Sequence, residues 1–240
     1  MLMRFILFTL LITLSFQTIA QKNQTDSKGK RHGPWEKKYD NGKTRYSGNF
    51  DHGKEIGLFK FYYEKGALKA ENFFRDKGRT SYCKQYSEKR CLAAEGKFIS
   101  GKKDSVWTYY DAEGNVLSRE SFVNDIKDGP SITYYPNKKV AEKVHFKNGI
   151  KQGPWIQNYG TGKRKIKATY KNGKLSGEAL YYKDNGEIRA KGFYKNGLMD
   201  GTWYYFNDKK EVERKEHWKR GILQKDEQEG SNELEEQTEK

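Results

Sequence analysis

Short stretches of alternating apolar and polar residues run along most of this chain. WIQNY (155–159), KIKATY (165–170) and EIRAKGFY (187–194) place apolar or aromatic side chains at alternate or near-alternate positions. A period of two and enrichment in rings are typical of β-strands, and the stretches lack helical spacing. Turn sequences such as DNGK (40–43) and AEGN (112–115) separate them. The pattern predicts strands of about five to seven residues joined by tight turns.

The pattern repeats every 24 residues. Steps of 24 that begin at Gly33 and end at Gly201 meet six glycines and two serines, and the residue 17 positions after each of them is aromatic. These eight recurring rings are Phe50, Phe74, Phe98, Phe122, Phe146, Tyr170, Tyr194 and Trp218. We expect the rings to pack the sheet, ring against ring across neighbouring hairpins, and the glycine or serine to mark a bend in the strand.

Each 24-residue unit is interpreted as a β-hairpin. Asn-Gly pairs at 148–149, 172–173 and 196–197 form the centre of a second turn near the end of each unit, and Asn-Gly favours a type I′ turn because both central residues need a positive φ. We therefore predict an all-β fold, an elongated single antiparallel sheet of about eight tandem 24-residue β-hairpin repeats. The predicted repeats are 33–56, 57–80, 81–104, 105–128, 129–152, 153–176, 177–200 and 201–224, with irregularity expected in the third to fifth.

The segments outside the repeats have a different composition. Residues 1–20 combine one arginine with a short apolar run and end on small residues at Thr18 and Ala20, which is typical of a cleaved signal peptide; an uncleaved anchor is the alternative. Residues 21–32 are predicted to be a flexible N-terminal segment, and residues 225–240 an acidic disordered tail. No further apolar run follows, so we expect an exported protein (periplasmic, outer-envelope associated or secreted) with no transmembrane segment after signal cleavage.

The repeats are strongly basic. The chain carries a net charge of +15, and removing the tail (−5), the signal peptide (+1) and residues 21–32 (+3) leaves +16. An acidic protein surface is the expected partner, with an anionic lipid or a glycan as the alternatives. Charge that serves only solubility and protection of sheet edges remains the other interpretation. Nucleic acid is not expected, because an exported protein rarely meets it.

A second set of rings recurs two residues after the unit start. Its members are Trp35, Phe59, Trp107, Trp155 and Trp203. A single-layer sheet has too little interior for every ring, so we expect this row to face outward as a binding surface. Interleaved lysines would suit an acidic protein, sugar stacking or anionic headgroups.

The sequence holds no recognisable catalytic motif. FKNGIKQG (146–153) has the glycines and lysines of a phosphate loop, but no helix follows and the motif recurs in other units, which favours a turn. The four histidines are scattered and are expected to be solvated. GxSxG and HExxH are absent. We therefore predict a non-enzyme with no cofactor, no catalytic residues and no metal site.

Cys83 and Cys91 leave one question open. An exported protein meets an oxidising environment, which favours a disulfide between them. A simple hairpin turn between the two would not place them opposite each other, which argues against it.

The recurring G-x-W-x-x-Y-Y…N-G-x…F-x-N-G-K…G pattern, clearest in 153–176 and 177–200, resembles MORN repeats. It is most similar to the longer bacterial variant that is often labelled as the antitoxin of a toxin–antitoxin pair. The resemblance covers 33–224. It implies an elongated antiparallel sheet that acts as a scaffold or binding surface for proteins or phospholipids, without catalytic residues. The leading hypothesis is therefore a protein-interaction or scaffold module at the bacterial cell envelope; an anionic lipid or glycan binder and an antitoxin-like or immunity protein are the alternatives.

Overall fold

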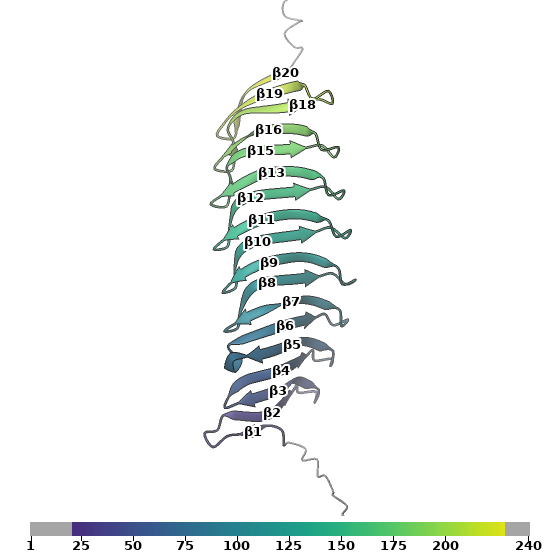
Figure 1. The fold of residues 1–240 in the computed structure, drawn as a ribbon, viewed down its shortest axis with the longest axis vertical. Helices are drawn as coiled ribbons and strands as arrows, with labels where there is room; N and C mark the ends of the chain where they lie inside the picture. The colour runs from purple at the N-terminus through teal and green to yellow at the C-terminus, as the bar shows by residue number, and fades with distance from the viewer. Residues whose placement is uncertain (1–20, 229–240) are drawn as a thin grey trace, which may run out of the picture.

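The computed structural model describes residues 21–228, which form one long antiparallel sheet (Figure 1). The strands are β1 (Gln24–Thr25), β2 (Arg31–Lys38), β3 (Thr44–Asp51), β4 (Lys54–Tyr62), β5 (Leu68–Arg75), β6 (Thr80–Tyr86), β7 (Leu92–Ile99), β8 (Lys102–Tyr110), β9 (Val116–Val123), β10 (Ile126–Tyr134), β11 (Val140–Lys147), β12 (Ile150–Asn158), β13 (Arg164–Lys171), β14 (Lys174–Leu175), β15 (Gly177–Tyr182), β16 (Ile188–Lys195), β17 (Leu198–Met199), β18 (Gly201–Phe206), β19 (Val212–Lys219) and β20 (Ile222–Gln228). The predicted signal peptide (1–20) and residues 229–240 of the predicted acidic tail lie outside the described residues.

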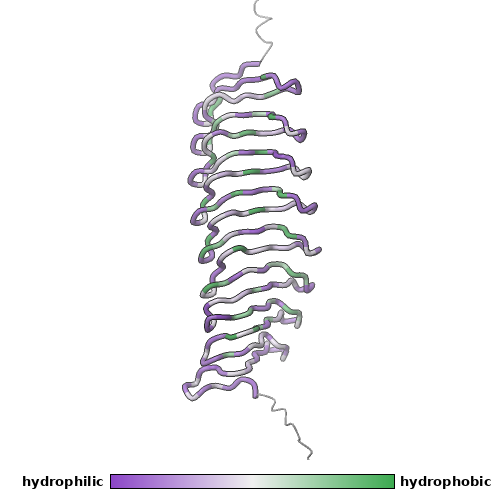
Figure 2. The backbone as a smooth tube through the Cα atoms, viewed as in Figure 1, coloured by the Kyte–Doolittle hydropathy of each residue, from purple (hydrophilic) through white to green (hydrophobic). Residues whose placement is uncertain are grey.

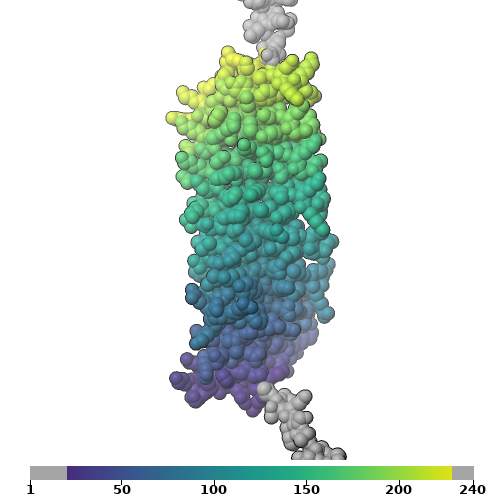
Figure 3. All heavy atoms as spheres, in the orientation of Figure 1, coloured from purple at the N-terminus to yellow at the C-terminus, as the bar shows by residue number. Residues whose placement is uncertain are grey.

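Each strand pairs with its neighbours in sequence, so the chain climbs the long axis of the molecule as a meander. Where β13 and β16 meet the next unit, the partner strand is interrupted, and each pairs with a two-residue strand as well as a longer one. The prediction of a single all-β sheet of hairpin repeats is confirmed. Figure 2 shows short hydrophobic stretches along the array, and Figure 3 shows the elongated molecule, in which the colour follows the chain from one end to the other.

Two kinds of turn connect the strands. The Asn-Gly turns have positive φ at both residues, for example 49° at Asn148 and 79° at Gly149, as a type I′ turn requires. The Gly149 N–H also donates to the Lys127 carbonyl at 2.8 Å, and the Gly173 N–H donates to the Lys151 carbonyl at 2.9 Å. Each of these turns is therefore hydrogen-bonded to the beginning of the first strand of the preceding hairpin, β10 or β12.

A tyrosine column lines the opposite edge of the sheet. Tyr39 donates its hydroxyl to the Tyr62 carbonyl at 2.7 Å, and Tyr63 donates to the Tyr86 carbonyl at 2.8 Å. The same contact recurs from Tyr135 and Tyr159 to the carbonyls 23 residues later. A side chain of one hairpin thus caps the backbone of the next, which couples neighbouring repeats beyond their strand pairing.

Most units begin with a left-handed residue beside a β-bulge. Gly57 has a φ of 65°, and the β3–β4 pairing shifts register between Ser47 and Asn49. The third unit differs: β5 and β6 pair without a shift, and the extra residues lie instead in a 3-10 turn at Asp76–Gly78. The third unit is therefore irregular, as expected, because its extra residues lie in the turn before β6 and not in a bulge within the strand pairing.

The structure differs from the expectation at both flanks. The segment 21–32 was expected to be flexible, but β1 pairs with β2 (Gln24 opposite His32), and the Asn23 N–H donates to the Pro34 carbonyl at 2.9 Å. The tail was expected to be disordered from residue 225, but β20 continues to Gln228. In both places the chain adds a strand because the adjacent hairpin leaves backbone N–H and C=O groups unpaired.

Consecutive side chains of a strand point to opposite faces, which divides the sheet into two surfaces. We call the face that carries Phe59, Trp107 and Trp203 the packed face, because all three rings are buried there. The face that carries their sequence neighbours, such as Leu58 and Val106, is the open face; these two are 44% and 52% exposed.

The turn position shared by Gly42 and Lys138 gives a test of backbone strain. Both residues are left-handed (φ 80° and 66°), and both N–H groups donate to the tyrosine carbonyl three residues earlier. Lys138→Gly should raise the stability of the array by about 0.5–1 kcal/mol, because a residue with a Cβ is strained there. Gly42→Ala should lower the stability by a similar amount, although its added Cβ meets open space.

Thermal unfolding followed by circular dichroism measures both changes. Lys138→Ala is the matched control, since it removes the same side chain but keeps the Cβ. Equal melting temperatures for Lys138→Gly and Lys138→Ala would contradict the strain argument.

Candidate binding face

The packed face is held together by rings that lie across bare backbone. Gly96 faces Trp107 and Gly192 faces Trp203, and a Cβ added to either glycine would fall within 3.0 Å of the indole. Each indole N–H also donates to the carbonyl of the residue after its glycine, Trp107 to Lys97 at 3.1 Å and Trp203 to Phe193 at 3.2 Å. The glycine therefore makes room for the ring, and the neighbouring carbonyl orients it.

This arrangement corrects the expected outward row of rings. Phe59, Trp107 and Trp203 are 1%, 0% and 3% exposed, so they cannot serve as a contact surface. Trp155 is only half-buried because it meets Val144 rather than a glycine, and its N–H donates to the Glu142 carboxylate at 2.7 Å. Trp35 is likewise half-buried.

The eight rings that recur 17 positions after each unit start lie beside this row on the packed face. Phe50 and Phe122 are buried, and the other six, Phe74, Phe98, Phe146, Tyr170, Tyr194 and Trp218, are half-buried. Phe98 meets Trp107 edge to face with ring centroids 4.8 Å apart. Lysines cover several of these rings, such as Lys151 over Tyr170 at 4.9 Å. Many basic side chains are thus part of the packing.

The open face carries a different row of cations in its C-terminal half. Its five members, which we call the basic ladder, are Arg119, Lys143, Lys167, Lys191 and Lys215. Each occupies the same position of its repeat, and an apolar residue of the intervening strand lies between neighbours. The alternating cross-strand pairs are Arg119–Ile132, Ile132–Lys143, Lys143–Ile156, Ile156–Lys167, Lys167–Leu180, Leu180–Lys191, Lys191–Tyr204 and Tyr204–Lys215.

The basic ladder is largely exposed, and its members form no ion pair among the described residues, although Lys215 lies opposite Glu227 in the strand pairing. Four of its members are exposed, and Lys191 is half-buried against Tyr204 at 5.4 Å. Ion pairs between described residues use other cations, such as Lys60, Lys127 and Arg214. Since each step spans two strands, neighbouring cations lie roughly 9–10 Å apart along the axis. The ladder can therefore attract an extended, negatively charged ligand along its whole length.

The N-terminal half of the open face is apolar and balanced in charge. A groove of about 810 Å³ crosses β4 to β8 and is lined by Leu58, Phe73, Tyr82 and Val106. Phe73 lies opposite both Leu58 and Tyr82 in the strand pairing. The Arg75 guanidinium lies 5.4 Å from the Phe73 ring centre. Exposed apolar patches of this kind mark interaction sites in soluble proteins.

The two cysteines are free thiols, which answers the open question against a disulfide. Cys83 lies opposite Gly96, whereas Cys91 lies in the turn beyond the Tyr86–Leu92 pair. A bridge needs the two Cα atoms within about 7 Å, and three residues of strand already span roughly 10 Å.

The fold and these surfaces define an open, single-layer array of β-hairpin repeats with a binding face. The chain belongs to the MORN repeat variant family, whose sequence model matches six segments: 31–52, 55–76, 103–124, 127–148, 151–172 and 175–196. The unmatched stretch 77–102 covers most of the irregular third unit. MORN repeats are generally non-enzymatic binding repeats, so the chain is a repeat-protein binding module.

Similarity to solved structures is weak. The Tc holotoxin pore of Photorhabdus luminescens (TccC3-D651A) is 12% identical over 75% of this chain, with a TM-score of 0.21. The TcdB2-TccC3-Cdc42 complex is 9% identical over 75% of the chain (TM-score 0.21), and a porin-like protein from Bacteroides uniformis is 9% identical over 80% of it and 91% of its own chain (TM-score 0.20). This chain spans only 13% and 12% of the two toxin chains. No curated protein matches.

Among residues 21–228, no helix is long and apolar enough to cross a membrane.

The contact between Gly96 and Trp107 can be tested with a double-mutant cycle. Gly96→Ala should destabilise the array by about 1–3 kcal/mol, because the added methyl group overlaps the buried indole. In a Trp107→Ala background the same substitution should cost little, since the ring is gone. The sequence already contains alanine at both equivalent positions between the sixth and seventh units, where Ala168 and Ala179 are buried in one cluster. An equal cost in both backgrounds, measured by chemical denaturation, would contradict the overlap.

The cysteines should differ in reactivity. Burial raises the pKa of the Cys83 thiol to about 11, and its side chain is nearly inaccessible. We expect iodoacetamide at pH 8 to modify Cys91 first, and Cys83 only after denaturation. Intact mass and peptide mapping without reductant measure both events. If iodoacetamide modified neither cysteine without reductant, before or after denaturation, the two cysteines would form a disulfide instead.

Proposed function

We propose that this protein is an exported interaction module that docks an acidic partner protein along the basic ladder. The observation that carries the proposal is the row of five cations, four of them exposed, that form no ion pair in the described part of the chain; only Lys215 lies opposite a carboxylate, that of Glu227. The apolar residues between them supply contact area once long-range attraction has brought the partner in. The basic composition of the repeats and the leader-like residues 1–20 support the same view.

The spacing favours an extended acidic segment. Three residues of an extended chain of polyproline II type rise about 9 Å and complete one turn, which is close to the two-strand step of the ladder. A segment with a carboxylate at every third residue would therefore place one acid near each cation. The apolar groove over β4–β8 continues the open face and would hold an apolar part of the same partner.

A matched pair of triple variants tests the proposal. Lys143→Gln, Lys167→Gln and Lys191→Gln remove three ladder charges, whereas Lys147→Gln, Lys171→Gln and Lys195→Gln remove the same charge from the turn edge. Fluorescence anisotropy with a labelled oligoglutamate peptide measures binding at low and high salt. We expect the ladder variant to bind about tenfold more weakly, because exposed pairs contribute roughly 0.2–1 kcal/mol each, and the edge variant to bind nearly as well as the wild type.

The same proteins distinguish the alternatives. Cosedimentation with phosphatidylglycerol vesicles, stronger than oligoglutamate binding and lost in the ladder variant, would favour an anionic-lipid binder. Equal weakening in both triple variants would mean that net charge alone drives binding, and would overturn the ladder as a site. The antitoxin-like role rests only on the family label, and a toxin-like partner recovered from a native envelope pulldown would support it.

A further inference from the structure

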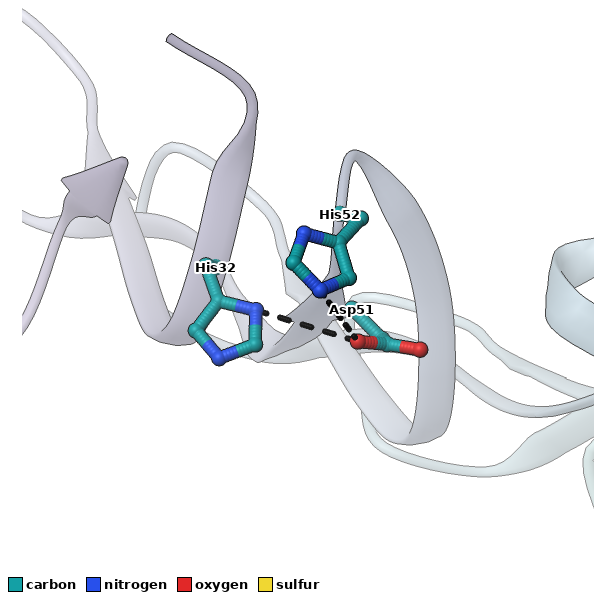
Figure 4. Close-up of side chains that lie close together, drawn as sticks. All are labelled: His32, Asp51 and His52. Carbon is teal, nitrogen blue, oxygen red and sulfur yellow. Dashed lines mark ion pairs between the residues drawn. The ribbon is translucent and has the colours of Figure 1, made fainter. Parts of the chain in front are cut away.

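A cluster of metal-ligating side chains lies at the N-terminal end of the array (Figure 4). His32 Nδ1 and His52 Nε2 each lie 3.8 Å from the same oxygen, Oδ1 of Asp51. The three ligand atoms all lie within 4.8 Å of one another, and the two rings are 4.9 Å apart. Two imidazole nitrogens and one carboxylate oxygen are a donor set that first-row transition metals use.

The register of the first hairpin brings these residues together. Gly33 pairs with Phe50, so His32 at the start of β2 lies next to Asp51 at the end of β3. His52 follows in the turn with a φ of 45°, at a place where other units use Asn148, Asn172 and Asn196 but also Ser100 and Arg220. The turn position therefore accepts several side chains, and the hairpin register is what brings His52 beside Asp51.

A fourth residue fixes the orientation of His52. His52 Nδ1 is 2.6 Å from Asp26 Oδ2, and the other Asp26 oxygen accepts the N–H groups of Lys28 and Lys30 at 2.9 Å each. The Asp26 side chain is only 9% exposed.

This second carboxylate decides which nitrogen of His52 is available. With its Nδ1 proton donated to Asp26 Oδ2, His52 has Nε2 left to act as a ligand, and Nε2 faces Asp51. A carboxylate that holds the far nitrogen of a histidine is a recurring feature of metal sites, because it fixes both tautomer and ring orientation. In this cluster Asp26 would be a positioning residue and His52 a ligand.

We propose that His32 Nδ1, Asp51 Oδ1 and His52 Nε2 form a binding site for Zn²⁺. Tetrahedral zinc with ligands at 2.0–2.1 Å needs ligand atoms about 3.3 Å apart. The two pairs at 3.8 Å have to close by about half an ångström, and the two histidine nitrogens, which lie within 4.8 Å of each other, by up to about 1.5 Å. Both histidine side chains are at least half-exposed, which allows that movement. The fourth position is left for water or for a ligand from another molecule.

The donor set also sets the selectivity. Ca²⁺ and Mg²⁺ prefer six or more oxygen ligands, whereas this cluster offers two nitrogens and one oxygen. Bound zinc would join the start of β2 to the β3–β4 turn, and through Asp26 it would fix the β1–β2 connection. It would therefore stabilise the end of the array where the sheet has its first edge.

Isothermal titration calorimetry on the tag-free mature chain (residues 21–240) tests the site directly, since a polyhistidine tag would bind zinc itself. We expect one Zn²⁺ per chain, no response to Mg²⁺, and loss of binding in His32→Asn and in His52→Asn. Asp26→Asn keeps all three ligands and should weaken binding about 10-fold or more. His145→Gln removes a histidine from the fifth unit and is the matched control.

A second measurement separates binding from folding. The melting temperature of the wild type should rise with added Zn²⁺, and those of His32→Asn and His52→Asn should not, while all variants keep the β-sheet circular dichroism of the wild type. No Zn²⁺ binding by the wild type would overturn the proposal. Equal binding by His32→Asn, His52→Asn and His145→Gln would overturn it too, because the ion would then be held elsewhere.

Discussion

The structure depends on rings that bury themselves on the backbone of the neighbouring strand. A single-layer sheet has no second layer to cover its side chains, so a ring can be buried only by packing against other parts of the same sheet. Gly96 and Gly192 leave a gap in which Trp107 and Trp203 lie flat, and the carbonyl after each glycine accepts the indole N–H. Removing most of such a side chain from water contributes about 1.5–3 kcal/mol. Where the gap is filled, as by Val144, the ring opposite stays half-exposed.

This contact joins one repeat to the next, because the glycine lies in the second strand of one hairpin and the ring in the first strand of the following one. The tyrosine column and the turn hydrogen bonds at the two edges act across the same junctions. A hairpin alone would lose all of them. Stability therefore resides largely in the junctions, as in other repeat proteins, and the terminal units need extra strands at β1 and β20 to cover their ends.

Much of this fold could be predicted from the sequence, because the 24-residue period, the alternation and the Asn-Gly turns are local signals. That the row of Trp35, Phe59, Trp107, Trp155 and Trp203 shares the packed face was not predicted, since alternation separates two faces without saying which rings are covered. The signal was present in the spacing of eleven residues from Gly96 to Trp107 and from Gly192 to Trp203. It becomes visible only when one unit is compared with the next. The histidine cluster was missed for a similar reason: His32 and His52 occupy different repeat positions and meet only through the hairpin register.

The two faces explain why the units can differ without losing the fold. Packing constrains the rings, the glycines and the lysines that lie over the rings, whereas the open face is constrained by little more than strand formation. Its character changes along the axis, from the apolar groove over β4–β8 to the basic ladder from β9 onward. The groove lies where the bulge is displaced, so that β5 and β6 pair flat and Phe73 stands directly opposite Tyr82. A departure from the regular repeat on one face thus creates a local surface on the other, and a uniform scaffold acquires distinct sites.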